Sequence, residues 1–596
     1  MMDRQLVILY GSQTGTAMDL AKRIRKQGKL RHFSTSLLAM NDFPIHRLAS
    51  TPLVVFVCSV TGQGDEPDNM KTFWRALRRR DLPAVLDDVQ FAVLGIGDSS
   101  YQNFNITAIR LDRRLRKLGA RPFVKIGLAD ESHDHGIDFV ADPWIAQLMD
   151  TLMEKFPLPP GQEFSLQDET IQPSFNVHFL SEKPVENKSW SEKQMPRKSG
   201  LYDADHPFQA TLISNKRATA EDHFQNVRFM KFDLASSGMS YAPGDTVNVF
   251  PKNLPEAVYE LLTFLELDGD QLISLSINDE DFSLPPHCRL SNPCTIREAA
   301  TNYWDFQGVP RKSFFELLTQ IAQDEREKER LTEFASAAGA NDLFDYCFRP
   351  RRNALEILQD FSDTAKRISL PYFFDLFPPI QARAFSIASS ARYHKDELHL
   401  LVAVVEYKTK LHRPRKGLCS NWLASLQPGR PVPLWVKKGT IKFEQTKDKP
   451  VVMVGPGTGV APFRSFIYER VSLAIGNSIL FFGCRNKAKD FYFEEEWKVL
   501  QGEGFLTVLP PAFSRDQEEK VYVQDSIRKA GAVVVKALVE DEGFFYLAGS
   551  ANSMPKEVEA ALKTVLCQHA DMKEEEALEY IKQLVSEGRY QTETWS

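Results

Sequence analysis

Through the first 155 residues, short apolar runs alternate with amphipathic segments. The apolar runs are rich in Val, Ile, Leu and Phe and lie at 5–10, 53–60, 91–97 and 123–128. Between them, apolar side chains recur with a helical period at 17–27, 69–80 and 106–118. This alternation predicts a doubly wound α/β domain with a parallel sheet, and such sheets bind ligands at the carboxyl ends of their strands.

The pattern then changes three times along the chain. From 156 to 203, Pro, Ser, Glu and Lys dominate, which predicts a linker with some β-like content at 174–180. From 204 to 448, strand signals surround a helical block at 255–361, which predicts an antiparallel barrel with a helical insertion. From 449 to 596, βα alternation resumes and closes on a long helical pattern and a short tail. The elements expected in these regions are strands at 227–234, 245–250, 382–388, 398–407, 432–436, 451–454, 478–483, 505–509 and 544–547, and helices at 313–323 and 325–337.

Composition excludes several classes of protein. The chain has 596 residues, of which 43% are hydrophobic and 26% charged, as in globular proteins of several domains. A net charge of −6 argues against nucleic acid as a partner. The seven cysteines show no CxxC pair and no metal-ligand spacing, so we expect a reducing compartment and no metal centre. No apolar segment reaches membrane length and no signal peptide precedes the first strand, so we expect a cytoplasmic protein without a membrane anchor.

A first phosphate-binding loop, Gly-Ser-Gln-Thr-Gly-Thr at 11–16, follows the first strand and precedes a helix. Hydroxyls, backbone N–H groups and a helix N-terminus would face an anion together there. The loop lacks the lysine of nucleoside triphosphatase loops and suits a monophosphate. Loops at 59–65 and 95–104 follow the next two strands and are expected on the same rim. Tyr101 would stack there on a flat ring such as a flavin.

A second, unlike loop is Gly455-Pro-Gly-Thr-Gly459, which lets the backbone approach a pyrophosphate closely at a helix N-terminus. It is not GxGxxG, so the common Rossmann fingerprint does not apply. Downstream, a strand is followed by cations and hydroxyls that suit an adenosine 2′-phosphate, at Ser514, Arg515, Lys520 and Tyr522. Trp595 would cover a flavin face and yield that place to a nicotinamide. The alternative for the segment from Ser514 to Tyr522 is a solvated basic loop, and the alternative for Trp595 is a disordered tail.

Two motifs of the barrel region suit a dinucleotide flavin. In Arg383-Ala-Phe-Ser386, the arginine fork matches pyrophosphate oxygens, and the serine hydroxyl would lie beside the ring. Lys416-Gly-Leu-Cys-Ser420 contains a turn of small residues that opens a helix and offers a second backbone anion site. Either motif alone is weak, since an Arg–Ser strand is usually a solvated barrel face. Together they predict FAD.

Taken together, these motifs resemble the diflavin reductase family, which includes NADPH–cytochrome P450 reductase. The resemblance covers the whole chain. It implies a flavodoxin-like FMN domain at 1–155, a linker at 156–203, an antiparallel FAD-binding barrel with a helical connecting insertion at 204–448, and a ferredoxin–NADP reductase-like α/β NADPH domain at 449–596. The activity it implies is that of an oxidoreductase passing electrons from NADPH to FAD, to FMN and to a one-electron protein acceptor.

The resemblance also assigns residues to each cofactor by motif. For FMN it implies Ser12, Gln13, Thr14, Gly15, Thr16, Ala17, Ser59, Val60, Thr61, Gly62, Ile96, Gly97, Asp98, Ser99, Ser100, Tyr101, Gln102, Asn103, Phe104, Asn105 and Glu131. For FAD it implies Arg351, Arg383, Ala384, Phe385, Ser386, Gly417, Leu418, Cys419, Ser420 and Trp595. For NADPH it implies Thr458, Ser514, Arg515, Lys520, Val521, Tyr522, Val523, Gln524 and Glu557.

The chain departs from the P450 reductase pattern at three places. Where that pattern has a catalytic cysteine in Cys-Gly-Asp-Ala, this chain begins the motif with Ala548. Glu593 replaces an aspartate, and Thr61 replaces the first FMN-stacking tyrosine. Assistance by a cysteine is therefore in doubt, and the expected catalytic residues are Ser386, Glu593 and Trp595.

The acceptor is the least constrained part of the prediction. Residues 1–155 hold 21 Lys and Arg against 18 Asp and Glu, with basic stretches at 75–80 and 110–117, so we expect steering toward an acidic acceptor. A solvated helical face is the alternative. Within the family, the absent anchor, the immediate first strand and the tail Gln-Thr-Glu-Thr-Trp favour a member that reduces anamorsin, an iron–sulfur protein of cytosolic cluster assembly. Reductases directed to a P450, methionine synthase or sulfite, and a flavin-binding regulatory scaffold without turnover, stay open.

Overall fold

A computed structural model describes residues 4–62, 64–79, 86–101, 103–158, 172–182, 201–278, 289–411, 413–443, 446 and 448–595. Gln102 and much of the predicted linker lie outside these residues. The described chain forms two compact units. The first takes in the described parts of 1–183, 255–286 and 290–379, and the second those of 184–254, 287–289 and 380–596.

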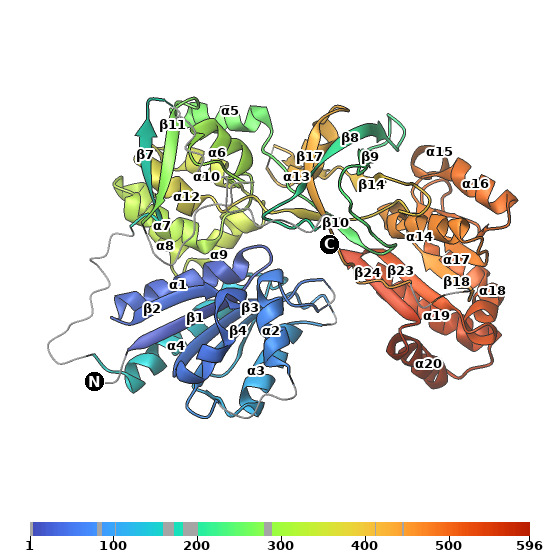
Figure 1. Ribbon diagram of the computed structural model, residues 1–596, viewed down its shortest axis with the longest axis horizontal. Helices are drawn as coiled ribbons and strands as arrows, with labels where there is room; N and C mark the ends of the chain where they lie inside the picture. Colours follow the sequence, from blue (N-terminus) through green and yellow to red (C-terminus); the bar gives the residue numbers. More distant parts are fainter. Residues whose placement is uncertain are drawn as a thin grey trace. The chain divides into compact units, whose positions relative to one another are not determined.

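The first domain is built on a parallel six-stranded sheet in the order β2-β1-β3-β4-β5, with β6 beside β4. Its strands are β1 (Gln5–Gly11), β2 (Ser34–Ala39), β3 (Leu53–Ser59), β4 (Gln90–Gly97), β5 (Arg121–Pro122) and β6 (Gly127–Asp130). Its helices are α1 (Thr16–Leu30), α2 (Lys71–Leu77), α3 (Ile106–Lys117) and α4 (Asp138–Lys155). The core shows α1 and α4 on one face of the sheet and α2 and α3 on the other (Figure 1). The doubly wound prediction is confirmed.

Three details of that prediction were wrong. The single strand expected at 123–128 is two short strands, because the pairing of β4 with β5 stops at Pro122 and resumes at Gly127 in β6. Phe123 N still donates to Phe91 O at 3.0 Å, and the ladder to β4 is taken up again only at Gly127. The edge strand β2 and the helix α4 were not predicted. Neither shows a clear apolar period, because β2 begins with the polar run Ser34–Ser36 and α4 contains Pro143 in its interior.

The helical block packs around the largest cluster of buried aromatic residues, which includes Trp304, Phe315 and Phe377. A three-stranded antiparallel sheet joins it, formed by β7 (Phe175–Leu180), β11 (Leu272–Ile277) and β12 (Cys294–Thr295). The β-like content expected at 174–180 is therefore confirmed and pairs with the block. Its helices are α5 (Pro255–Phe264), α6 (Ile296–Asn302), α7 (Lys312–Ile321), α8 (Glu325–Ala335), α9 (Ala340–Leu343), α10 (Ala354–Asp360), α11 (Ser362–Ala365) and α12 (Phe373–Leu376).

In the second unit, six antiparallel strands are ordered β13-β10-β17-β8-β9-β14. A bridge between Ile387, just after β13, and Leu400 of β14 joins the two edges, which closes the barrel expected from the sequence. The strands are β8 (Phe208–Arg217), β9 (Val227–Asp233), β10 (Thr246–Val249), β13 (Arg383–Ser386), β14 (Glu397–Ala403) and β17 (Pro431–Lys437). The expected strand at 398–407 ends early at Ala403, and β15 (Glu406–Tyr407) instead pairs with β16 (Arg415–Lys416), ahead of α13 (Leu418–Ser425).

The last domain is a parallel five-stranded sheet in the order β21-β19-β18-β23-β24. Its strands are β18 (Val451–Val454), β19 (Ser478–Phe481), β21 (Leu506–Val508), β23 (Phe544–Ser550) and β24 (Tyr590–Trp595), with the short pair β20 (Gly483–Cys484) and β22 (Ala512–Phe513) beside them. Its helices are α14 (Ala461–Ser472), α15 (Lys487–Asp490), α16 (Glu494–Gly502), α17 (Val523–Lys529), α18 (Gly531–Val535), α19 (Met554–His569) and α20 (Glu574–Ser586). The expected tail is the strand β24, which places Glu593 opposite Ala548 and Trp595 opposite Ser550. None of the helices in the described residues is both long and apolar enough to span a bilayer.

Candidate functional site

The three predicted loops of the first domain meet at the carboxyl edge of its sheet. Ser12 N donates to Asn69 Oδ1 at 2.8 Å, which ties the first loop to the chain after β3. Val60 N donates to Ile96 O at 3.1 Å, and Glu131 N to Gly97 O at 2.7 Å. The expected convergence of the loops on one rim is therefore present.

The loop at 11–16 has the donor set of a monophosphate site. Gly15 has φ +93°, a conformation that favours glycine, and α1 begins directly after it. Ser12 Oγ accepts from Gly15 N at 3.0 Å, and the hydroxyls of Thr14 and Thr16 lie 3.4 Å apart. Arg311 Nη2 donates to Thr14 O at 3.0 Å. The hydroxyls and first-turn N–H groups of this loop, with the Arg311 guanidinium against it, fit a phosphate dianion.

Several predicted FMN residues shape the rim through their own hydrogen bonds. Asn105 is fully buried at φ +52°, and its Nδ2 donates to Ala129 O at 3.0 Å. Its amide therefore joins α3 to β6 and does not point outward as a ligand. Asp98 accepts from Ser100 N at 2.8 Å, and Ser99 N donates to Asp130 Oδ1 at 2.9 Å. Of the predicted FMN residues in the same loop, Asn103 is exposed and Tyr101 is half-buried.

Charge at the rim is mixed. Desolvation and the neighbouring Asp98 raise the pKa of Glu131, while the Arg311 guanidinium acts in the opposite direction. Thr61 N donates to Asp65 O at 3.0 Å, and Gly62 has φ +54°, so this loop is a tight turn. Ser59 is buried, and its Oγ lies 3.5 Å from Gly11 O.

The predicted FAD residues divide between the two compact units. Arg383 and Ala384 are exposed on β13, an end strand of the barrel order, while Phe385 and Ser386 are half-buried. Arg351 belongs to the first unit, where it is exposed at φ +56°. Its assignment to FAD stays a prediction.

The turn before α13 is held by side chains that the sequence assigned to ligand binding. Ser420 Oγ accepts from Val405 N at 3.0 Å and donates to Gly417 O at 3.3 Å, so its hydroxyl locks the turn. Burial raises the pKa of the Cys419 thiol to about 12, which keeps it neutral. The helix α13 begins after Gly417 without a side-chain cap, and the first N–H groups of a helix have no partner within the helix.

A pocket of about 520 Å³ opens beside the loop after β18. Gly459 lies so close to β23 that a Cβ there would come within 2.2 Å of Ala548 O. The predicted residues that line the pocket are Thr458, Ser514, Val521, Tyr522, Val523, Gln524, Glu557 and Trp595. Arg515 and Lys520 are exposed and stand outside this lining.

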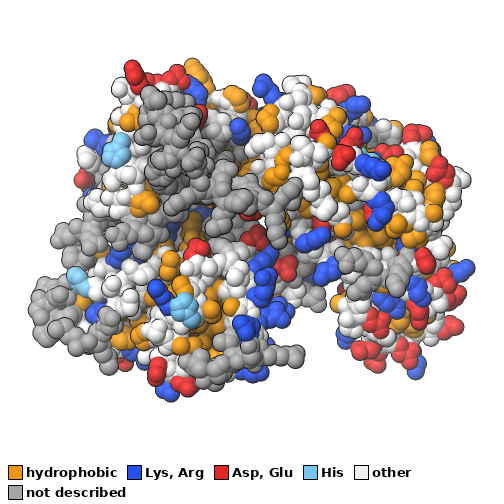
Figure 2. Space-filling model, viewed as in Figure 1, with side chains coloured by type: hydrophobic (Ala, Val, Ile, Leu, Met, Phe, Trp, Pro, Cys, Tyr) orange, Lys and Arg blue, Asp and Glu red, His pale blue; other side chains and the backbone are white. Residues whose placement is uncertain are grey.

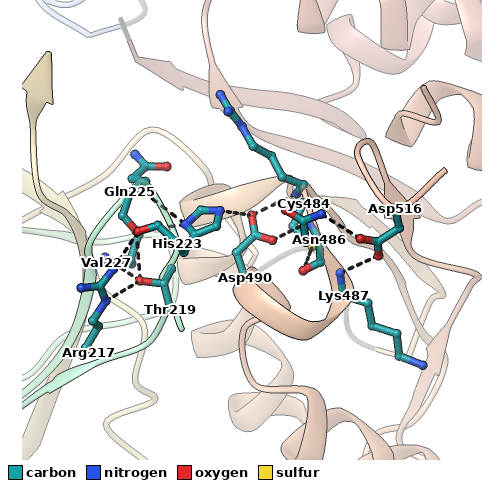
Figure 3. Close-up of polar contacts among 11 residues, drawn as sticks. Arg217, Thr219, His223, Gln225, Val227, Cys484, Asn486, Lys487, Asp490 and Asp516 are labelled. Carbon is teal, nitrogen blue, oxygen red and sulfur yellow. Dashed lines mark hydrogen bonds and ion pairs between the residues drawn. The ribbon is translucent and has the colours of Figure 1, made fainter. Parts of the chain in front are cut away.

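Sequence reasoning missed one wall of this pocket. Cys484, Arg485 and Asp490 line it, and Gln225 reaches it from the chain between β8 and β9. Asp490 accepts from Arg485 N at 2.9 Å and Asn486 N at 2.7 Å, and lies 3.6 Å from His223 Nε2 (Figure 3). The sequence signal for this wall was the Gly-Cys-Arg-Asn run at 483–486, which is separated from the end of β19 by one residue.

Asp516 extends the same wall. It accepts from Asn486 Nδ2 at 2.8 Å and from Lys487 N at 2.7 Å (Figure 3). Arg515 N donates to Arg485 O at 2.9 Å, which draws the two arginine-bearing loops together. Burial and the Asp490 carboxylate raise the pKa of the Cys484 thiol, so it stays protonated.

Ser386 at the end of β13 contacts Glu593 of β24, although the two residues are 207 positions apart in the sequence. Ser386 Oγ lies 3.4 Å from Glu593 Oε1, and Glu593 Oε2 is buried without a hydrogen-bond partner among the described residues. Burial raises the pKa of Glu593 to about 7, and the hydrogen bond from Ser386 partly opposes this shift. Trp595 stands two residues further along the same strand, with 36% of its surface exposed.

Comparison with known families agrees with these three regions. Residues 8–144 match the flavodoxin family, 201–422 the FAD binding domain, and 453–560 the oxidoreductase NAD-binding domain. The chain is thus an oxidoreductase with domains for FMN, FAD and a nicotinamide nucleotide.

Full-length relatives narrow this class. The chain is 46% identical to NADPH-dependent diflavin oxidoreductase 1 of Danio rerio, with 99% of each chain covered. It is 44% identical to the proteins of that name from Xenopus laevis, with 100% of each covered, and Bos taurus, with 99% of each covered. The chain belongs to the NADPH-dependent diflavin oxidoreductase 1 family.

Proposed function

We propose that this chain oxidises NADPH and passes the electrons through FAD and FMN to an acidic iron–sulfur protein of the anamorsin kind. The observation that carries the proposal is the pair Ser386 and Glu593 beside Trp595 and a nucleotide-sized pocket. A regulatory scaffold without turnover has no use for a buried acid of raised pKa at that place. Bound flavins link a donor of electron pairs to an acceptor of single electrons.

The chain's own groups have distinct tasks in this proposal. The loop after β18 receives the pyrophosphate of NADPH, and Ser514 and Arg515 hold the 2′-phosphate. Glu593 holds a proton near neutral pH, and Ser386 orients its carboxyl group. Trp595 stands at the pocket and shields the site until the nicotinamide displaces it.

The first domain supplies a basic surface for the acceptor. Figure 2 shows Lys and Arg side chains gathered around α2. Arg110, Arg113 and Lys117 are exposed on α3, and Arg75 and Arg78 are exposed along or just after α2. Such a surface speeds encounter with an acidic partner at low ionic strength.

Arg114 does not belong to this surface. Its Nε donates to Leu77 O at 2.7 Å, and its Nη2 donates to Arg79 O at 2.8 Å. It therefore fixes the end of α2 to α3, and a substitution there would disturb the fold. A test of steering leaves Arg114 in place.

The proposal is tested by NADPH-driven reduction of an anamorsin-type iron–sulfur protein. Neutralising Arg110, Arg113 and Lys117 to Gln is expected to slow this reduction about tenfold at low salt, and less at high salt, because screening weakens steering. A matched triple variant at the exposed residues Lys529, Lys536 and Lys582 of the last domain is expected to match wild type. Equal rates for both triple variants across salt concentrations would contradict the acceptor surface.

A further inference from the structure

An arginine of the helical insertion reaches the phosphate loop of the first domain. Arg311 immediately precedes α7, yet its Nη2 donates to Thr14 O at 3.0 Å across 297 residues of sequence. A Cβ built on Gly15 would lie 3.4 Å from the same nitrogen. The guanidinium therefore lies directly against the loop that we assign to the FMN phosphate.

A buried polar network fixes the contact beside Arg311. Ser313 Oγ donates to Asp19 Oδ1 of α1 at 2.6 Å. Lys312 pairs with Asp142 of α4, and the Lys312 side chain is only 6% exposed. Arg311 thus sits at the start of a helix whose first turn is anchored to two helices of the first domain.

Arg23 of α1 ties the same surfaces together. Its guanidinium nitrogens lie 2.6 Å from Asp138 and 2.6 Å from Asp142, both in α4, and 3.5 Å from Glu316 in α7. The three acids raise the pKa of Arg23 against the effect of burial. Charged groups buried in matched pairs define one docking geometry, because any shifted arrangement leaves a charge unpaired.

We propose that Arg311 is a ligand of the FMN phosphate, supplied by the helical insertion and not by the FMN domain itself. The inference rests on the proposed FMN site. Its consequence is a thermodynamic coupling: docking of the first domain onto the insertion strengthens FMN binding, and FMN binding strengthens docking by the same factor. The planar fork of arginine suits a phosphate dianion, and the neighbouring groups at 12–16 supply only neutral donors.

The test measures FMN affinity of the full chain by the fluorescence of FMN released on dilution. Arg311→Ala is expected to weaken FMN binding about tenfold at low salt, and Arg311→Lys to weaken it less, because the charge remains without the fork. Arg326→Ala, at an exposed position on α8, is the matched control and is expected to bind FMN as wild type does. FAD content reports that each variant is folded.

Hydrogen exchange gives the reciprocal readout. In wild type, adding FMN to stripped protein is expected to increase protection of α7 amides, and in Arg311→Ala this increase is expected to be lost. If Arg311→Ala bound FMN as tightly as wild type and showed the same FMN-induced increase in protection of α7, the inference would be overturned while the proposed function would stand. A wild-type chain that binds no FMN would overturn the proposed function together with it.

Discussion

At the scale of single residues, Glu593 carries the most specific chemistry of the second unit. Its carboxyl group lies against Ser386, and one of its oxygens is buried without a hydrogen-bond partner in the described part of the chain. A charged carboxylate is disfavoured in such a place, which is why the pKa of Glu593 rises to about 7. The acid can therefore exchange a proton at physiological pH.

This raised pKa makes stability depend on pH. Below about pH 4.5 the acid is neutral in both the folded and unfolded chain. As pH rises to about 7, the unfolded chain gains a solvated carboxylate while the folded chain keeps the proton, so wild type loses stability, up to about 3 kcal/mol. The stability of Glu593→Gln relative to wild type is therefore expected to increase from about pH 4.5 to pH 7 and to stay constant above pH 7.

Calorimetric Tm values between pH 5 and pH 8.5 measure the effect. Glu575→Gln, at an exposed position of α20, is the control and is expected to follow wild type throughout. A constant difference between Glu593→Gln and wild type at every pH would refute the raised pKa.

Arg515 tests the choice of nucleotide. Arg515 is exposed, and its backbone N donates to Arg485 of the pocket wall at 2.9 Å, so its guanidinium would meet the 2′-phosphate that NADPH has and NADH lacks. Arg515→Ala is expected to raise the KM for NADPH about tenfold and to leave the KM for NADH nearly unchanged. The control is Arg528→Ala, since Arg528 already pairs with Asp525 at 2.8 Å on α17. Equal changes for both nucleotides would remove the 2′-phosphate assignment.

The sequence predicts residues where a motif carries them, but it does not show which of their side chains serve the fold. Ser386 and Glu593 were predicted together and lie together. The side chains of Asn105 and Ser420 bond within the chain, so a role for either residue in ligand binding would use its backbone and stays a prediction. Arg311 was missed because nothing in its local sequence signals a contact 297 residues away.

At the scale of elements, the strand–loop–helix unit of β18 and α14 depends on a glycine. A Cβ at Gly459 would lie 2.2 Å from the Ala548 carbonyl, so alanine must push the loop off β23. Gly459→Ala is expected to lower the NADPH-driven rate at least about tenfold while both flavins stay bound. Gly457→Ala is the matched variant, because its Cβ meets nothing within 4 Å and only its φ of +58° is strained, at about 1–2 kcal/mol.

Rates with NADPH and flavin content after dithionite reduction separate the two glycine variants. Gly459→Ala with normal NADPH kinetics would show that the close approach does not shape the nucleotide pocket. Loss of activity in Gly457→Ala to the same degree would assign the effect to backbone strain.

Element prediction succeeded where apolar residues repeat regularly and failed at edges. Fully buried strands such as β3 read as unbroken apolar runs and were found. The terminal strand β24 reads Tyr-Gln-Thr-Glu-Thr-Trp, whose polar middle hides a strand that pairs on one side only. Its position opposite β23 is what brings Glu593 and Trp595 to the site, and only tertiary structure reveals it.

At the scale of the whole molecule, three domain types known from separate families lie in one chain. The structure divides this chain into two compact units, with the helical insertion in the same unit as the first domain. The contacts of Arg23, Lys312 and Arg311 explain that grouping physically. The sequence order alone predicted the domains but not this association.

The central claim is a path from NADPH through two different flavins. The most direct measurement is the flavin content of the purified chain, followed by its visible absorbance during anaerobic titration with NADPH. The account predicts one FMN and one FAD per chain and bleaching of both by NADPH. A colourless protein, a single kind of flavin, or flavins that NADPH leaves oxidised would contradict it.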